Sequence, residues 1–253
     1  LDPITLRHAP TEMMPMIAAL NSLFERIGKL LESERRFTAD AAHELRTPIA
    51  AIRMQAQVAM GEADDALRQH ALQGTLEGCD RATRLVEQLL TLARQEASTA
   101  VNDPVDLRAT AQLALADVAP AAQARSMDVG LLESDAATVT GNAEALRMLA
   151  RNLLDNAIKY GQDGGTITLT LQKTDRHARL IVTNPGEPIP PEQLKRLFER
   201  FYRGVEQSNR TADGVGLGLA IVKHVALTHH GEVTVWSAPG QGSTFSLTLP
   251  WAQ

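Results

Sequence analysis

The chain has little cysteine and no concentration of positive charge. Cys79 is the only cysteine in 253 residues, so an internal disulfide and a zinc site built from cysteines are both excluded. The formal net charge is -5, and no block of lysine and arginine is present, so we expect neither nucleic acid nor a membrane surface as a partner. The apolar stretch 13–24 is interrupted by Pro15 and Asn21, and no run reaches the roughly 18 apolar residues that a membrane-spanning helix needs.

The two halves of the chain differ in their hydrophobic pattern. Up to about residue 100 the sequence has almost no strand-like segment, whereas later residues alternate short β-branched runs with helices and glycine clusters. With 44% hydrophobic and 22% charged residues, the composition is ordinary for a globular protein. We therefore predict two domains, joined by the small, polar, proline-ended segment 98–104.

Residues 13 to 60 are rich in residues that favour a helix, and one histidine stands out within them. An apolar stripe with spacings of four, three and four residues is formed by Leu45, Ile49, Ile52 and Ala56. His43 lies about 200° around the helix from Leu45, so it is predicted to face water.

The neighbours of His43 suit nucleophilic chemistry. Glu44 could accept the hydrogen of one ring nitrogen and leave the other as a neutral nucleophile. The hydroxyl of Thr47, one turn away on the same face, could hold a water, and Pro48 is expected to bend the helix. On this segment alone, an exposed histidine beside a glutamate is more often a solvated surface pair.

The N-terminal half also carries a heptad seam, which needs a partner helix. The seam consists of Met13, Ile17, Leu20, Phe24, Ile27 and Leu31. Residues 60–64 break the pattern, and a second helix is expected to run to about residue 97. Its apolar side is formed by Leu72, Leu76, Leu85, Leu89 and Leu92. One such hairpin cannot cover its own stripe, so we predict a dimeric four-helix bundle, in which Cys79 is a packing residue.

The second half is predicted to form an α/β sandwich. The expected helices are 107–124, 143–160 and 216–229, and the expected strands are 127–132, 138–140, 166–172, 178–183, 232–237 and 243–249. On the helix 143–160, three polar residues share one face, because Asn152, Asn156 and Lys159 are spaced by four and three. Carboxamide oxygens can bind Mg²⁺ and a lysine can bind phosphate, although such residues on a helix are usually just its solvated side.

Glycines precede the helix that starts near residue 216. The segment 214–223 contains Gly214, Gly216 and Gly218 where free backbone amides and the helix dipole favour a phosphate. It fits neither the dinucleotide-binding pattern nor a P-loop, since the required third glycine and the Gly-Lys-Ser/Thr sequence are missing.

These segments, taken in order, resemble the sensor histidine kinases of two-component systems, over nearly the whole chain. Residues 37–48 resemble the phosphoacceptor box of the HisKA domain, and residues 152–160, 182–190, 197–203, 214–223 and 240–245 resemble the motifs of the HATPase_c domain. The similarity is greatest to the quorum-sensing and tricarboxylate sensor kinases of proteobacteria. Two positions depart from the family pattern: Asn184 stands where aspartate is usual, and Pro188 replaces a glycine.

The resemblance implies a domain order and a fold. Residues 1–34 correspond to the end of a HAMP-like signal-relay helix, 35–100 to the dimerisation and phosphotransfer domain, and 101–253 to the catalytic ATP-binding domain. The implied fold is an all-α hairpin, dimerising into a four-helix bundle, followed by an α/β sandwich of the Bergerat (GHKL) type. The chain starts at Leu1, and we expect a longer protein with an upstream membrane anchor, of which this is the cytoplasmic portion.

The resemblance also assigns residues to roles. His43, Glu44 and Thr47 are the catalytic residues, ATP and Mg²⁺ are the cofactors, and Asn156 is the metal ligand. The residues that bind the nucleotide are Asn152, Asn156, Lys159, Tyr160, Asn184, Gly186, Arg200, Arg203, Gly214, Gly216, Gly218 and Thr244. Residues 204–213 are expected to form a flexible lid whose arginines contact phosphates.

The implied activity is autophosphorylation of His43 by Mg-ATP, transfer of the phosphoryl group to an aspartate of a response-regulator receiver domain, and dephosphorylation of that regulator. The implied partners are a second copy of the chain and the regulator. One alternative is a GHKL-type ATPase, but the residue four before Asn156 is Asn152 where such an enzyme needs a catalytic glutamate. Another is a degenerate dimeric scaffold, which only Asn184 and Pro188 favour.

Overall fold

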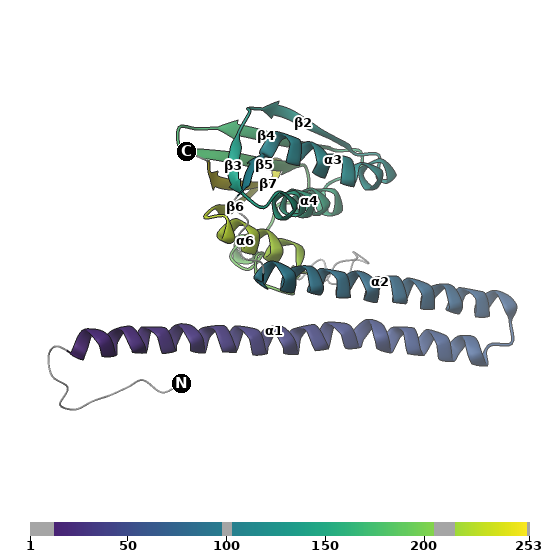
Figure 1. Ribbon diagram of the computed structural model, residues 1–253. Helices are drawn as coiled ribbons and strands as arrows, with labels where there is room; N and C mark the ends of the chain where they lie inside the picture. Colours follow the sequence, from purple (N-terminus) through teal and green to yellow (C-terminus); the bar gives the residue numbers. More distant parts are fainter. Residues whose placement is uncertain (1–12, 98–102, 205–215, 252–253) are drawn as a thin grey trace. The chain divides into compact units, whose positions relative to one another are not determined.

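The computed structural model describes residues 13–97, 103–204 and 216–251 (Figure 1). Within these ranges the chain divides into two compact units, residues 1–83 and 84–253. None of the helices in the described ranges is long and apolar enough to cross a membrane.

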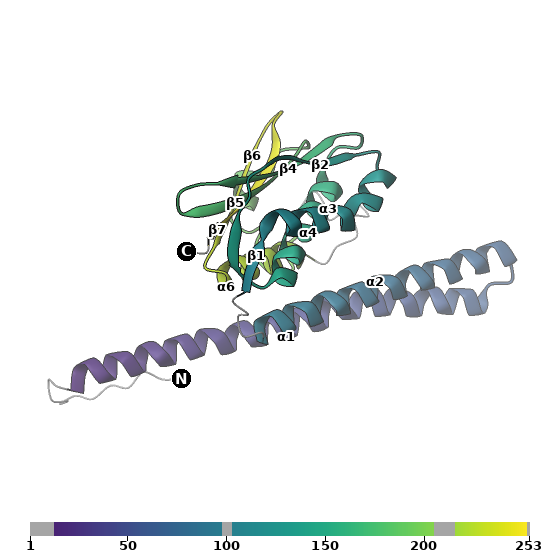
Figure 2. The same ribbon diagram turned by 45° about the horizontal axis from the view of Figure 1, so that its top comes forward.

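The first unit is a helical hairpin. Helix α1, Met14–Gly61, and helix α2, Asp65–Ala97, run antiparallel beside each other in both views (Figures 1 and 2). The turn between them falls in the predicted segment, and Asp64 caps α2 by accepting the backbone N–H groups of Ala66 at 2.8 Å and Leu67 at 3.1 Å. The predicted interruption of the helical pattern is therefore confirmed.

Two glycines of α2 lie in close contact with α1. A Cβ atom at Gly78 would lie 2.6 Å from Ile52 Cγ1, and one at Gly74 would lie 3.4 Å from Gln55 Cδ. By contrast, Leu72 and Leu76 on the predicted apolar side are 50% and 61% exposed. The predicted apolar side of α2 is thus only partly covered within one chain, since Leu85 is buried whereas Leu72 and Leu76 are not.

The second unit is a two-layer sandwich. Its five-stranded sheet has the order β2-β4-β5-β7-β6 and is antiparallel except for the β2–β4 pair. The strands are β2, Asp128–Ser134; β4, Thr166–Lys173; β5, His177–Asn184; β6, Glu232–Ala238; and β7, Gly242–Pro250. Helices α3, Leu107–Ala124; α4, Ala143–Tyr160; and α6, Gly218–Thr228, cover one face of this sheet (Figures 1 and 2). The short helix α5 is Pro191–Leu194.

The core lies between the helices and the sheet because apolar residues alternate along the strands. Ile167, Leu169 and Leu171 of β4 are fully buried, as are Leu149 and Leu153 of α4. Each such side chain contributes roughly 1.5–3 kcal/mol when it is removed from water. This layer fixes α4, and with it the polar residues on the other side of that helix.

The predicted fold class, a helical hairpin followed by an α/β sandwich, is confirmed. The sequence did not indicate strand β1, Asp103–Asp106, part of which was assigned to the linker; it pairs with β3, Thr138–Gly141. Pro104 lowers the strand propensity of β1, and the pairing depends on a segment more than 30 residues away. The rest of the predicted linker, residues 98–102, and most of the predicted lid, residues 205–213, lie outside the described ranges.

Candidate functional site

The histidine lies on an unbroken stretch of α1. The helix continues through Pro48, and His43 and Thr47 are both exposed while Glu44 is half-buried. The predicted exposure of His43 is confirmed. The side chains of His43 and Glu44, both within the described range 13–97, make no hydrogen bond to each other, and the His43 side chain is exposed to solvent.

The polar face of α4 contains four of the predicted site residues. Asn152 is half-buried, its Nδ2 donates to the Met148 carbonyl at 3.0 Å, and its Oδ1 would lie 3.3 Å from a Cβ atom at Gly218. Asn156 is half-buried, and its carboxamide makes no hydrogen bond within the described part of the chain. This unpaired oxygen has the chemistry of a Mg²⁺ ligand.

No group of three or more His, Cys, Asp or Glu side chains in the described ranges is arranged to hold a metal ion. A Mg²⁺ ion beside Asn156 would therefore take most of its ligands from phosphate oxygens and water. That coordination is the usual one for Mg²⁺ at a nucleotide, so Asn156 fits the predicted ion as a single protein ligand.

The last turn of α4 brings a cation and a phenol together. Lys159 Nζ lies 5.1 Å from the ring centroid of Tyr160. Burial raises the pKa of the Tyr160 phenol, and the positive charge of Arg203 acts in the opposite direction. Arg200 is half-buried and Arg203 is exposed. The end of α4 therefore has Lys159 and the charge of Arg203 near a phenol that is protonated at neutral pH.

The end of β5 meets the end of α4. Asn184 is 4% exposed, and its Nδ2 donates to the Pro185 carbonyl at 3.3 Å, which leaves its Oδ1 as the acceptor atom. Gly186 passes the helix end so closely that a Cβ atom there would lie 2.9 Å from the Tyr160 carbonyl oxygen. The two predicted segments are thus brought together at this point.

Strand β7 completes this side of the site. Gly242 has a φ of 72°, and a Cβ atom on it would lie 2.0 Å from the Asn184 carbonyl oxygen. The buried Ser243 pairs with Asn184, and the Thr244 hydroxyl is 3.1 Å from that of Thr183. Thr183 and Ser243 were not among the predicted site residues, and only the register of β5 and β7 reveals them.

Glycines shape the start of α6. Gly216 has a φ of 76°, and a Cβ atom there would lie 2.8 Å from the Tyr202 carbonyl oxygen. Its own carbonyl accepts the Phe201 N–H at 3.0 Å. Gly218 then opens α6, whose first backbone amides have no helical partner and can receive an anion. Gly214 lies outside the described residues.

The second unit therefore brings together most of the predicted nucleotide residues, from α4, β5, β7 and α6, whereas His43, Glu44 and Thr47 belong to the first unit. Arg125, which binds the end of α4, was not indicated by the sequence, because its partners are more than 30 residues away.

Comparisons with known proteins match both units. The model of the His Kinase A (phospho-acceptor) domain matches residues 33–98, and that of the histidine kinase-, DNA gyrase B-, and HSP90-like ATPase matches residues 141–253. The sensor protein QseC of Salmonella typhimurium is 41% identical over 254 residues, covering 98% of this chain and 54% of QseC. The chain thus spans about half the length of the curated relatives that it matches.

Two solved structures are similar. The mycobacterial sensor histidine kinase MprB is 32% identical, with a TM-score of 0.52, covering 60% of this chain and 98% of that one. Full-length ShkA in complex with AMPPNP is 27% identical, with a TM-score of 0.63, covering 87% of this chain and 46% of that one.

Proposed function

The chain belongs to the sensor histidine kinases, and on that premise we propose that it phosphorylates its own His43 with ATP. A ring nitrogen of His43 forms a bond to the γ-phosphorus, the bond from phosphorus to the β–γ bridging oxygen breaks, and ADP leaves. The observation that carries the proposal is an exposed histidine on a helix, in the same chain as the nucleotide cradle, by which we mean the polar residues of α4, β5 and β7 and the glycines at the start of α6 described above. Phosphoryl transfer depends mainly on positioning and charge neutralisation, which these residues supply.

Different residues of the nucleotide cradle bind the base, the phosphates and the metal ion of Mg-ATP. The Oδ1 atom of Asn184 accepts a hydrogen bond from the amino group of adenine, while Gly186, Thr244 and Tyr160 line the base and ribose region. The amides of Gly216 and Gly218, with Lys159, Arg200 and Arg203, neutralise the phosphates, together with Gly214 and Asn152. Asn156 holds Mg²⁺, which supplies positive charge to the phosphate oxygens when it is bound. The capture of an ATP analogue by the similar protein ShkA supports this use of the fold.

Glu44 acts while His43 is being phosphorylated, and Thr47 acts in a later step. Glu44 orients the imidazole by accepting a ring N–H when His43 reacts. The phosphohistidine then passes its phosphoryl group to an aspartate of a response-regulator receiver domain. Thr47, one turn away and exposed, positions a water for hydrolysis of the phospho-regulator.

The assembly that we propose is a homodimer. Leu72 and Leu76 are 50% and 61% exposed in the single chain. A second hairpin would cover them, as in a four-helix bundle. We assign residues 1–34 to a signal-relay helix, 35–100 to the phosphotransfer domain and 101–253 to the catalytic domain. Because the matched relatives are about twice as long, we place this chain on the cytoplasmic side of a membrane-anchored sensor.

Labelling with γ-³²P-ATP tests the proposal. The wild-type chain should acquire an acid-labile, base-stable label, and His43→Gln should abolish it while keeping nucleotide affinity. The matched control is His70→Gln, since His70 is likewise an exposed histidine on a helix of the hairpin. Release of inorganic phosphate without protein labelling would indicate an ATPase instead, and absence of both reactions a scaffold.

A further inference from the structure

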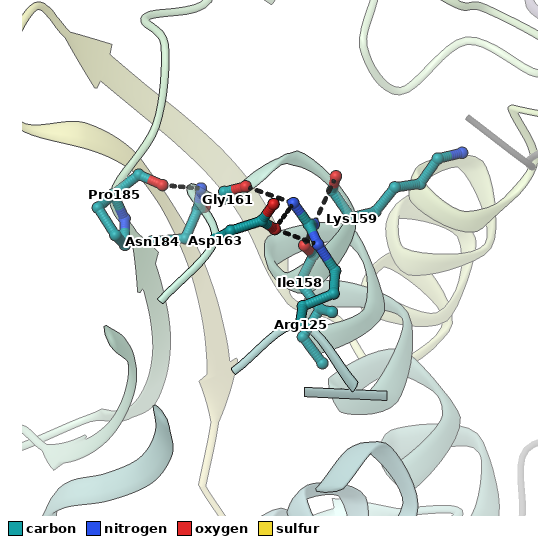
Figure 3. Close-up of polar contacts among 7 residues, drawn as sticks. All are labelled: Arg125, Ile158, Lys159, Gly161, Asp163, Asn184 and Pro185. Carbon is teal, nitrogen blue, oxygen red and sulfur yellow. Dashed lines mark hydrogen bonds and ion pairs between the residues drawn. The ribbon is translucent and has the colours of Figure 1, made fainter. Parts of the chain in front are cut away.

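One side chain from the end of α3 binds the carboxyl end of α4. The guanidinium of Arg125 donates to the backbone carbonyls of Ile158, Lys159 at 3.0 Å and Gly161 at 3.1 Å. It also binds the carboxylate of Asp163, with Nε at 2.7 Å from Oδ1 (Figure 3). Four groups of the segment 158–163 thus meet on one guanidinium.

These contacts supply hydrogen-bond donors to the last backbone carbonyls of α4. The last carbonyls of a helix have no helical donor, and they carry the negative end of the helix dipole. At the end of α4, the Gly161 N–H donates to the Ala157 carbonyl at 2.8 Å, and Arg125 donates to the carbonyls of Ile158 and Lys159. The planar fork of arginine can reach several acceptors at once, whereas the single ammonium of lysine cannot hold the same set in one geometry.

The segment that Arg125 holds in turn supports the loop after β5. The Gln162 N–H donates to the Pro185 carbonyl at 3.1 Å, and Asn184 Nδ2 donates to the same oxygen at 3.3 Å. A Cβ atom on Gly165 would lie 2.7 Å from Pro185 Cγ, so the turn and the loop are in close contact. The turn that follows α4 and the side chain of Asn184 therefore meet at one acceptor, the Pro185 carbonyl.

We propose that Arg125 is a positioning residue for the nucleotide: it fixes the last turn of α4 relative to the loop 184–186. Lys159 and Tyr160 lie on that last turn, and Figure 3 shows the Lys159 side chain extending away from the guanidinium. Arg125 touches neither base nor phosphate in this role; it acts through the backbone that carries those residues. The inference rests on the proposed function, namely that this cradle binds ATP.

The chain offers a matched control in Arg147. This residue also joins α4 to α3, through a bidentate contact with Asp117 at 2.6 and 2.9 Å. The side chains of Arg147 and Arg125 are similarly exposed, at 34% and 32%. Arg147 lies eleven residues before Ile158, about 16 Å along the helix, so it is remote from the last turn.

The experiment compares Arg125→Gln, Arg125→Lys, Asp163→Asn and Arg147→Gln in the full chain. Thermal unfolding gives the melting temperature, and titration of a fluorescent ATP analogue, with competition by Mg-ATP, gives the Kd. Both glutamine variants should lower the melting temperature, but only Arg125→Gln should also raise the Kd, by about tenfold, as expected for the loss of one well-placed charged contact. Arg125→Lys should restore the melting temperature more than the Kd, and Asp163→Asn should give a smaller Kd increase.

Equal Kd values for Arg125→Gln and Arg147→Gln at equal loss of stability would overturn the positioning role and leave Arg125 as a stabilising cap. If Arg125→Gln does not fold, Arg125→Lys and Asp163→Asn decide, and unchanged Kd values in both would overturn it. Failure of the proposed function has a different result, since the wild-type chain would then either bind no Mg-ATP or bind it without acquiring label on His43.

Discussion

The replacement of Asn184 by aspartate tests how the cradle distinguishes adenine from guanine. In the structure the Asn184 amide group donates to the Pro185 carbonyl, and its Oδ1 remains free to accept from the amino group of adenine. Guanine presents a carbonyl oxygen at that position. Asn184 can turn its amide to donate to it, because the Pro185 carbonyl keeps a second donor in the Gln162 N–H at 3.1 Å. A carboxylate has no such donor.

The magnitude follows from the charge of the acceptor and the burial of the side chain, which is 4% exposed. A hydrogen bond to a charged group contributes about 1.5–3 kcal/mol, compared with about 1 kcal/mol for a neutral pair. Asn184→Asp strengthens the contact with adenine and repels the guanine oxygen, so the ATP/GTP affinity ratio should rise by about 10- to 100-fold. The wild-type chain should discriminate less.

Competition of ATP and GTP against a fluorescent nucleotide measures the two affinities in each protein. Asn142→Asp is the matched control, because Asn142 caps α4 by accepting the Ala145 N–H at 3.0 Å, and an aspartate caps a helix equally well. The control adds the same charge to the same unit and should leave the ratio unchanged. An identical ratio in the wild type and Asn184→Asp would refute the argument that this side chain reads the base.

Three further predictions follow from single side chains. Asn156→Ala removes the unpaired oxygen, so Mg²⁺-dependent ATP affinity should fall about tenfold with little change in melting temperature; equal affinities with and without Mg²⁺ in the wild type would contradict it. Thr47→Ala should keep His43 labelling while slowing regulator dephosphorylation, and a wild-type decay rate would exclude the role of Thr47. His229 accepts the Asn142 N–H at 3.0 Å through Nε2, and burial lowers its pKa below the ordinary 6.5. The unfolded chain therefore binds the extra proton first, so stability should fall as the pH drops below about 6.5, and less so in His229→Gln. Melting temperatures measured against pH would contradict this if both proteins gave the same slope.

Local patterns determined most of the secondary structure. The helix through His43, the turn near residue 61 and the helix carrying Asn152 and Asn156 follow from spacing and helix propensity, since both are local properties. The glycines near the start of α6 were recognisable for the same reason. The exposure of His43 also followed, because the position of a side chain around a helix depends only on its distance along the sequence from the apolar stripe.

Contacts between segments that are distant in the sequence could not be predicted from local patterns. Strand β1 forms only because β3 offers it a partner, and a proline within it hides the signal. Likewise, of the leucines of α2 predicted to form its covered side, Leu85 is buried but Leu72 and Leu76 are exposed in one chain, whereas Gly74 and Gly78 lie against α1. A helical periodicity identifies the apolar residues, but it does not state which neighbour covers them.

The sequence by itself determined the two fold classes and most of the side chains of the candidate site, because those features are encoded in short spacings. Only the tertiary structure decided how the end of α4, the loop after β5 and the start of β7 meet. Arg125 and Asp163 are 38 residues apart, and Asn184 meets Ser243 through strand pairing. Such contacts are set by the pairing of strands within the sheet and by the close packing of α3 and α4 on it, neither of which a local pattern of residues specifies.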